Sequence, residues 1–169
     1  MLYNNIEIAL IQEHNVKSLN SLEYLAKFYK IFLNPTICIK GGTAIMITKK
    51  LDVAIENVYL HPSSRLLKVD MKIQDKGFHI FCVYAHSGSN HNKEREEFFE
   101  QEVLPLLQNI SNKVIIGGDW NCIISNKDSS NPDNSNFSNA LKNIVNCLTL
   151  KDVHNYVTIK QKMSQCFNW

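Results

Sequence analysis

The sequence lacks the features that mark membrane, secreted or metal-thiolate proteins. Its five cysteines include no Cys-x-x-Cys pair, so neither a zinc-thiolate site nor a disulfide framework is indicated. We expect them to be small core residues of a protein in a reducing compartment. No apolar run approaches the length of a membrane span, and residues 1–7 lack the basic start and apolar core of a signal peptide. These absences predict a soluble, intracellular protein with no membrane partner.

A strong charge of one sign is also missing. The net charge is +2, from 18 basic and 16 acidic residues, which by itself does not argue for nucleic-acid binding. Hydrophobic residues make up 44% and charged residues 20%, a globular composition. The sequence has no repeat, low-complexity tract or linker. We therefore expect residues 1–169 to form a single domain.

What is present is an alternation of short apolar runs and amphipathic segments. Apolar or alternating runs predict strands at residues 6–11 (buried on both faces), 29–33, 41–48 (entered through two glycines), 53–60, 67–73, 78–85 and 114–119. The turn at residues 75–77 predicts a hairpin. Helical faces are expected at residues 22–29, 92–109 (kinked or split by Pro105) and 137–148 (N-capped by Ser135 or Asn136). This mixture predicts a layered α/β sandwich with mixed sheets.

The most informative segment is residues 114–121, Val-Ile-Ile-Gly-Gly-Asp-Trp-Asn. Side chains alternate along a strand, so Asp119 and Asn121 are expected to project together from its end. Asp119 could orient or deprotonate an attacking water, and Asn121 could donate hydrogen bonds to a phosphate oxygen. The alternative is a turn in which these residues only end the strand.

Two other predicted strands also end on polar side chains. Glu13 follows the strand at residues 6–11, and its carboxylate suits Mg²⁺, although it can equally be an ordinary exposed glutamate. Tyr84 could donate its hydroxyl to phosphate, or be a core aromatic with a polar tip. The six histidines show no metal-ligand spacing and are expected at the surface or in turns. Cys122 has no base placed to activate it, which favours a buried thiol.

Six segments carry a resemblance to a known family. They are residues 9–15 (Ala-Leu-Ile-Gln-Glu-His-Asn), 40–45 (Lys-Gly-Gly-Thr-Ala-Ile), 83–90 (Val-Tyr-Ala-His-Ser-Gly-Ser-Asn), 93–99 (Lys-Glu-Arg-Glu-Glu-Phe-Phe), 116–122 (Ile-Gly-Gly-Asp-Trp-Asn-Cys) and 150–153 (Leu-Lys-Asp-Val). In this order and spacing they resemble the endonuclease/exonuclease/phosphatase superfamily. The resemblance is greatest to the apurinic-type endonuclease domain at the front of non-LTR retrotransposon polyproteins.

This resemblance implies a four-layered α/β sandwich of two mixed sheets flanked by helices. It implies cleavage of DNA phosphodiester bonds with Mg²⁺, or Mn²⁺ in its place. Carried over by motif, Glu13 is the metal ligand and Tyr84 contacts phosphate, while Asp119 orients or deprotonates the water and Asn121 positions the phosphate. In the complete domain the nick supplies a 3′ end for reverse transcription, which places the parent element in the nucleus.

The sequence also departs from this family. The family opens with an Asn-x-Asn-Gly strand and closes with a Ser-Arg-Ile-Asp-Arg segment and a Ser-Asp-His strand, and neither end is found here. His86 stands where the family usually has proline. We therefore expect a single partial domain at residues 1–169, without its first and last strands and with weak or no activity as given. Losing an inner strand exposes a sheet edge.

Two other functions stay open. A phosphatase or phosphodiesterase of the same superfamily would act on a small phosphoester and would need a pocket rather than an open groove. A non-catalytic remnant would bind nucleic acid or protein and would show salt-dependent DNA binding without cleavage. The expected partner is DNA, bound by a monomer without a small-molecule cofactor.

Overall fold

The computed structural model describes residues 6–36, 41–108, 110, 113–125 and 136–152. Its strands are β1 (Ile8–Gln12), β2 (Tyr29–Asn34), β3 (Thr43–Thr48), β4 (Ala54–Leu60), β5 (Leu66–Ile73), β6 (Lys76–Tyr84) and β7 (Lys113–Asp119). Its α-helices are α1 (Glu23–Ala26), α2 (Asn92–Phe98), α3 (Leu104–Leu107) and α4 (Asn139–Cys147). Two 3₁₀ turns, η2 (Leu19–Leu22) and η3 (Ser89–His91), and a π-helical turn, η4 (Phe99–Val103), complete the set.

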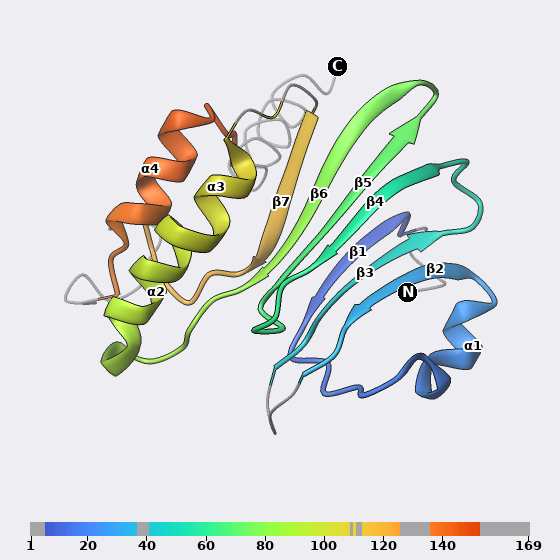
Figure 1. Cartoon of the computed structure of the whole chain (residues 1–169), viewed down its shortest axis with the longest axis horizontal. Coiled ribbons are helices and arrows are strands. Elements are labelled where there is room, and N and C mark those ends of the chain that lie inside the picture. Colours follow the sequence, from blue (N-terminus) through green and yellow to red (C-terminus); the bar gives the residue numbers. More distant parts are fainter. Residues whose placement is uncertain (1–5, 37–40, 109, 111–112, 126–135, 153–169) are drawn as a thin grey trace, which may run out of the picture.

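The strands form two sheets that pack face to face, as Figure 1 shows. The three-stranded sheet has the order β1-β3-β2 and is antiparallel throughout its described residues. The four-stranded sheet has the order β4-β5-β6-β7 and is mixed, because β6 and β7 run parallel. Helices α2, α3 and α4 lie against its outer face. The predicted α/β sandwich is confirmed, although only one of the two described sheets is mixed.

Two hydrophobic cores hold these layers together. Between the sheets, β3, β5 and β6 contribute fully buried side chains that include Ile45, Val69 and Ile80. Between the four-stranded sheet and the helices, Phe81 and Phe99 belong to a second core. Burial on alternate faces follows from the two-residue period of the strands. β6, which is buried along its second half, therefore belongs to both cores.

Local sequence signals explain two of the connections. Gln74 and Asp75 have φ values of 48° and 61°, which fits the left-handed backbone of a tight two-residue hairpin loop between β5 and β6. The predicted helix at residues 92–109 is split into α2, η4 and α3, and Pro105 lies in the first turn of α3. Proline has no N–H to donate to the preceding turn, so a helix boundary at this point is expected. The predicted hairpin and the predicted break are both confirmed.

Other sequence predictions need correction. Ser138, not Ser135 or Asn136, is the N-cap of α4, since its side chain accepts a hydrogen bond from the Leu141 N–H. Cys82 is buried, but Cys147 is exposed because it lies in the last turn of α4. His61 lies in the turn between β4 and β5, as predicted for the histidines, but it is buried, with 8% exposure, and its ring contacts Ser63 and Glu102. In the part of the chain that the structure describes, no helix is long and apolar enough to span a bilayer.

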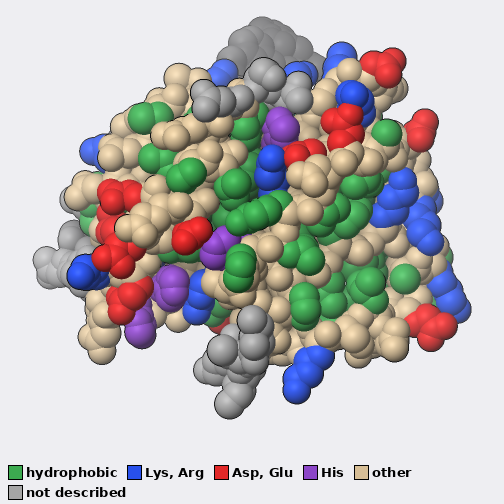
Figure 2. All heavy atoms as spheres, in the orientation of Figure 1, with side chains coloured by type: hydrophobic (Ala, Val, Ile, Leu, Met, Phe, Trp, Pro, Cys, Tyr) green, Lys and Arg blue, Asp and Glu red, His purple; other side chains and the backbone are tan. Residues whose placement is uncertain are grey.

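Each sheet has two edge strands among the described residues, β1 and β2 in the smaller sheet and β4 and β7 in the larger one. β1 pairs only with β3, and β7 pairs only with β6. β1 is therefore half-buried along its length, which corrects the prediction of a strand buried on both faces. On β7, Ile115 is 45% exposed. Figure 2 shows hydrophobic side chains spread over the middle of this face, between the helices and the three-stranded sheet.

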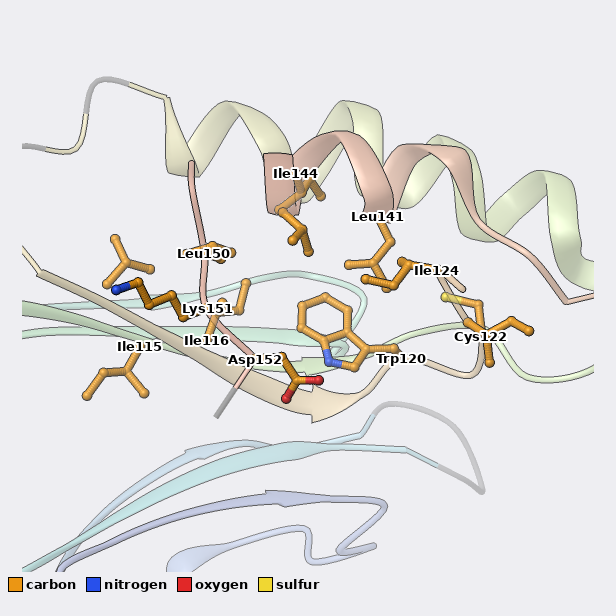
Figure 3. Close-up of a pocket in the computed structure, with 13 residues that line it drawn as sticks. Ile115, Ile116, Trp120, Cys122, Ile124, Leu141, Ile144, Leu150, Lys151 and Asp152 are labelled. Atoms are coloured by element: carbon orange, nitrogen blue, oxygen red, sulfur yellow. The ribbon is translucent and has the colours of Figure 1, made fainter. Parts of the chain in front are cut away.

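An apolar groove of about 570 Å³ lies between β7 and α4. Leu141 and Ile144 point from α4 toward Trp120 and Ile116, as Figure 3 shows, and Lys151 and Asp152 lie at its border. The groove lies beside β7, whose outer edge is unpaired among the described residues.

Candidate functional site

Two of the four predicted site residues are brought together by the pairing of β6 with β7. Because these strands are parallel, their carboxyl ends lie at the same edge of the sheet, and Tyr84 is in register with Asp119. The Ala85 N–H donates to the Asp119 carbonyl oxygen at 2.8 Å, so the pairing continues to the last residue of each strand. Asp119 is exposed and Tyr84 is buried.

The third residue, Glu13, arrives from the other sheet. It directly follows β1 and has a φ of 51°, so the chain turns sharply there. The Tyr84 hydroxyl donates a hydrogen bond to Oε1 of Glu13 across the two sheets. Glu13 is itself exposed. Glu13 therefore lies beside the Tyr84 hydroxyl, and Asp119 lies beside Tyr84 in the neighbouring strand. Both acidic residues are exposed.

The turn that presents Glu13 is held by the residues after it. His14 Nδ1 accepts a hydrogen bond from the Val16 N–H at 2.9 Å, and the Asn15 N–H donates to the Gly41 carbonyl at 3.3 Å. Gly42 has a φ of 92°, and a methyl group on it would lie 2.5 Å from the His14 ring. Burial lowers the pKa of His14, which keeps its ring neutral near pH 7. The glycine and the neutral ring therefore fit each other at the base of the turn.

The fourth residue, Asn121, reaches the site in a different way from the one predicted. β7 ends at Asp119, and Asn121 has a φ of 50°, so strand alternation does not continue to it. Its backbone N–H donates to Asp119 Oδ1 at 3.1 Å, and its side-chain Nδ2 donates to the Ala85 carbonyl oxygen at 3.0 Å. The Asn121 amide thus lies beside the end of β6, with one N–H used in holding it there.

Two glycines before Asp119 make this arrangement possible. Gly118 has a φ of 146°, and a methyl group there would lie 1.8 Å from the Val83 carbonyl oxygen. A methyl group on Gly117 would lie 2.9 Å from Leu10 Cδ1 of β1. Only glycine fits both the backbone angle and the close approach. The Gly-Gly pair is therefore what allows β7 to lie close to both neighbouring strands at the site.

The surroundings of Tyr84 keep its hydroxyl protonated. Burial raises the pKa of Tyr84, and the neighbouring Glu13 carboxylate raises it further. At neutral pH the group is a hydrogen-bond donor, as its contact with Glu13 requires. Tyr84 is thus able to orient a carboxylate or donate to an anion, but it is not a base.

Sequence reasoning missed Arg65, which lies directly before β5. Its guanidinium lies 4.9 Å from the centre of the Tyr84 ring, and Nη1 donates to the carbonyl oxygens of Tyr84 and Ala85, each at 3.3 Å. The Ala85 carbonyl therefore accepts from both Arg65 and Asn121. The one sequence feature that could have drawn attention to Arg65 is that the sequence contains only two arginines, Arg65 and Arg95.

Solved structures share this architecture. An AP endonuclease from Archaeoglobus fulgidus superposes with a TM-score of 0.69 at 17% identity, over 86% of this chain and 62% of that one. The human Nocturnin catalytic domain with bound sulfate gives 0.64 at 15% identity, over 85% and 57%. D. rerio TDP2 complexed with a single-strand DNA product gives 0.58 at 19%, over 72% and 50%. The chain has the fold of the endonuclease/exonuclease/phosphatase superfamily.

Sequence comparison adds nothing to this assignment, because no protein-family model and no curated protein matches the chain. The chain spans 50–62% of the length of these three structures. Proteins with this fold typically depend on a divalent cation. The described residues contain no cluster of three or more His, Cys, Asp or Glu side chains that could hold a metal.

Glu13 and Asp119 nevertheless fit a magnesium ion of the kind that is bound by few protein groups. Mg²⁺ keeps several waters and takes one or two carboxylates together with substrate phosphate. Both side chains are exposed, and both influence the same tyrosine hydroxyl. The donor set is made of hard oxygen atoms, which suits Mg²⁺ or Mn²⁺ and not a soft metal.

Proposed function

We propose that this chain is part of a metal-dependent nuclease that hydrolyses phosphodiester bonds in DNA. The observation that carries the proposal is the convergence of Glu13, Tyr84, Asp119 and Asn121, which come from three strand ends in two sheets. Carboxylates, a protonated phenol and a carboxamide in one solvent-open place match the needs of phosphoester hydrolysis. The fold is one on which AP endonuclease and TDP2 are built, which agrees with this choice of reaction.

Each residue has a role that its contacts allow. Glu13 and Asp119 would hold the divalent cation, which when bound supplies neutralisation of the phosphate charge. Asp119 is exposed, and among the described residues its carboxylate accepts a single hydrogen bond, from the Asn121 N–H; it would orient or deprotonate the attacking water. Asn121 has a second amide N–H that can donate to a phosphate oxygen, and the protonated Tyr84 fixes Glu13.

We also propose that the complete protein is longer and belongs to a mobile element. Among the described residues the outer edges of β1 and β7 are unpaired and an apolar groove lies beside β7, which supports a larger sandwich in which further strands cover these surfaces. The order of motifs in the sequence supports the retrotransposon type, which nicks target DNA as a monomer in the nucleus. On this proposal the chain as given has weak or no activity.

A plasmid-nicking assay tests the proposal. The chain is joined to an upstream Asn-x-Asn-Gly strand and to downstream Ser-Arg-Ile-Asp-Arg and Ser-Asp-His segments. The completed domain should nick supercoiled DNA with Mg²⁺, and EDTA should stop it.

Asp119→Ala should lower the rate by about 10²–10⁴-fold, the usual contribution of a general base. Asp52→Ala is the matched control, since Asp52 is an exposed carboxylate in the loop before β4. A completed domain that nicks equally well with Asp119→Ala contradicts the role of Asp119.

The main alternative is a phosphatase that acts on a small phosphoester. Within the described residues, the groove of about 570 Å³ is mostly apolar and is lined by residues that include Trp120 and Ile144 but neither Glu13 nor Tyr84. The carboxylates are open to solvent instead, which favours a polymeric substrate. A panel of small phosphoesters assayed with Mg²⁺ would separate the two functions.

A further inference from the structure

We infer that Arg95 is a positioning residue for Asn121, which it fixes through the backbone of residues 85–86; the role rests on the proposed function. Arg95 lies in α2 and is buried, with 1% exposure. None of the ion pairs among the described residues includes it. A buried cation without a carboxylate partner is costly, because it loses its hydration and gains no opposite charge. Its hydrogen bonds are therefore the contacts that keep the guanidinium in the core.

The guanidinium of Arg95 joins the start of α2 to the segment that follows β6. Nη1 donates to the His86 carbonyl oxygen at 2.9 Å, and Nη2 donates to Asn92 Oδ1 at 2.5 Å. In the described part of the chain, the His86 carbonyl has no other hydrogen-bond partner. The planar fork of arginine can bridge two acceptors in this way, whereas lysine offers a single nitrogen. The contact between Arg95 and His86 thus fixes the direction of one backbone carbonyl.

The backbone that Arg95 holds is also the backbone that holds Asn121. The Ala85 carbonyl, directly before His86, accepts from Asn121 Nδ2 at 3.0 Å. Arg65 Nη1 donates to the same carbonyl at a longer distance, 3.3 Å. Because peptide units are planar, the φ and ψ angles of His86 alone relate the directions of the two carbonyls. By fixing the His86 carbonyl, Arg95 therefore restricts where the Ala85 carbonyl can point.

The charge of Arg95 also reaches the segment that carries Asn121. Burial raises the pKa of Cys122, the next residue, to about 11, and the charge of Arg95 acts against this rise. Arg95 is thus near both partners of the hydrogen bond between Ala85 and Asn121. Without Arg95 the Ala85 carbonyl would be free to turn, and the second N–H of Asn121 would no longer point at the phosphate. Since Arg95 is buried, it acts on the substrate only through Asn121.

Side-chain NMR of the chain as given tests this positioning directly. The Asn121 amide resonances are identified as the pair that is absent from Asn121→Ala. Arg95→Met keeps a long side chain in the core, and replacing a buried charge by an apolar group is often neutral for stability. It should shift the Asn121 resonances and give the proton facing Ala85 a temperature dependence closer to that of an exposed amide. Asp70→Asn is the control: Asp70 contacts only other strand residues, and its loss should leave this pair unchanged.

A double-mutant cycle in the completed domain adds a kinetic readout. Arg95→Met should lower kcat for nicking by about 10–10²-fold with little change in KM, as expected when a catalytic group is slightly misplaced. In an Asn121→Ala background the same substitution should have almost no further effect, because the amide that it positions is gone. Arg95→Lys should recover part of the loss, since one nitrogen still reaches the His86 carbonyl. It is also the variant for both measurements if Arg95→Met does not fold.

Two results overturn the inference. Unchanged Asn121 resonances in a folded Arg95 variant would show that Arg95 does not hold this amide. An equal loss of kcat in the parent and Asn121→Ala backgrounds would show that Arg95 supports the fold without positioning Asn121. Failure of the nuclease proposal looks different. A completed domain that never nicks, while Arg95→Met still shifts Asn121, would end the nuclease proposal alone. Nicking that needs Asp119 but not Arg95 would end the inference alone.

Discussion

Leu10 of β1 packs against the bare backbone of Gly117 in β7, so closely that a methyl group on Gly117 would lie 2.9 Å from Leu10 Cδ1. The contact joins the edge strands of two different sheets. Glu13 lies three residues beyond Leu10, and Asp119 lies two residues beyond Gly117. The close approach of these strands therefore sets how near the two carboxylates come to each other, although neither Leu10 nor Gly117 has any chemistry of its own.

Gly117→Ala should destabilise the chain because the added methyl must push β1 away from β7. Overpacking of this kind costs about 1–3 kcal/mol in the free energy of unfolding. Urea denaturation monitored by the fluorescence of Trp120 and the other tryptophan would measure it. The double variant Leu10→Ala/Gly117→Ala is the control, since the shorter side chain at position 10 removes the clash. Its loss of stability should be clearly smaller than the sum of the two single losses, and additive losses would contradict the contact.

The elements of this fold were largely predictable because each is marked locally. The hairpin between β5 and β6 was predictable, although its loop is Gln74 and Asp75 and residues 76–77 of the predicted turn already belong to β6, and the break before α3 follows from the missing N–H of Pro105. The N-cap of α4 was misplaced because Phe137 looked like the first apolar residue of the helix. In the structure Phe137 pairs with Ile123 in an isolated bridge, and the helix begins after Ser138.

The site was predictable only in part. Glu13, Tyr84 and Asp119 were identifiable because each follows an apolar run, and the end of a strand is where side chains leave the core. Their juxtaposition depends on the parallel pairing of β6 with β7 and on the approach of β1, which no local pattern encodes. Arg65 was invisible for the same reason, since its contact with Tyr84 joins residues 19 positions apart through the β5–β6 pairing.

Asp70 should give the chain an acid-sensitive component of stability. Partial burial raises the pKa of Asp70, but hydrogen bonds from His79 Nδ1 at 2.6 Å and from Lys68 outweigh it and hold the pKa below 3.8, its ordinary value. A lowered pKa in the folded state means that this stabilisation is present above pH 3.8 and is lost as the pH falls below it. Asp70→Asn should therefore lower the Tm at pH 7 and make little difference in strong acid.

Thermal unfolding across this pH range would check the prediction for Asp70. Glu56→Gln is the matched control, because Glu56 pairs with Lys72 at the exposed surface, where ion pairs contribute little. It should leave the Tm almost unchanged at either pH. An equal drop for Asp70→Asn in acid and at neutral pH would show that the charge of Asp70 is not what stabilises the sheet.

Ser138 should contribute to stability through the cap that it forms on α4. Its buried hydroxyl oxygen accepts from the Leu141 N–H at 3.0 Å, satisfying one of the free N–H groups of the first turn. Ser138→Ala should cost about 1 kcal/mol in the free energy of unfolding, and Ser138→Thr should recover part of it. Asn139→Ala, at the exposed neighbouring position, should cost much less. Equal losses of stability at positions 138 and 139 in urea denaturation would show that the Ser138 side chain does not stabilise α4 as an N-cap.

Tyr84→Phe should separate the chemistry of the site from its packing. The substitution keeps the ring under Arg65 and removes only the hydroxyl that donates to Glu13. In the completed domain the nicking rate should fall by about 10²-fold, the usual effect of losing one preorganised donor, while the Tm stays close to that of the parent. Because burial and Glu13 raise the pKa of Tyr84 above its ordinary value of 10.0, the midpoint of any activity loss caused by Tyr84 ionisation should lie above pH 10. Tyr59→Phe is the control, since Tyr59 lies in β4 on the far side of β5 from Tyr84. If both variants nick at the parental rate, the hydrogen bond between Tyr84 and Glu13 has no part in the reaction.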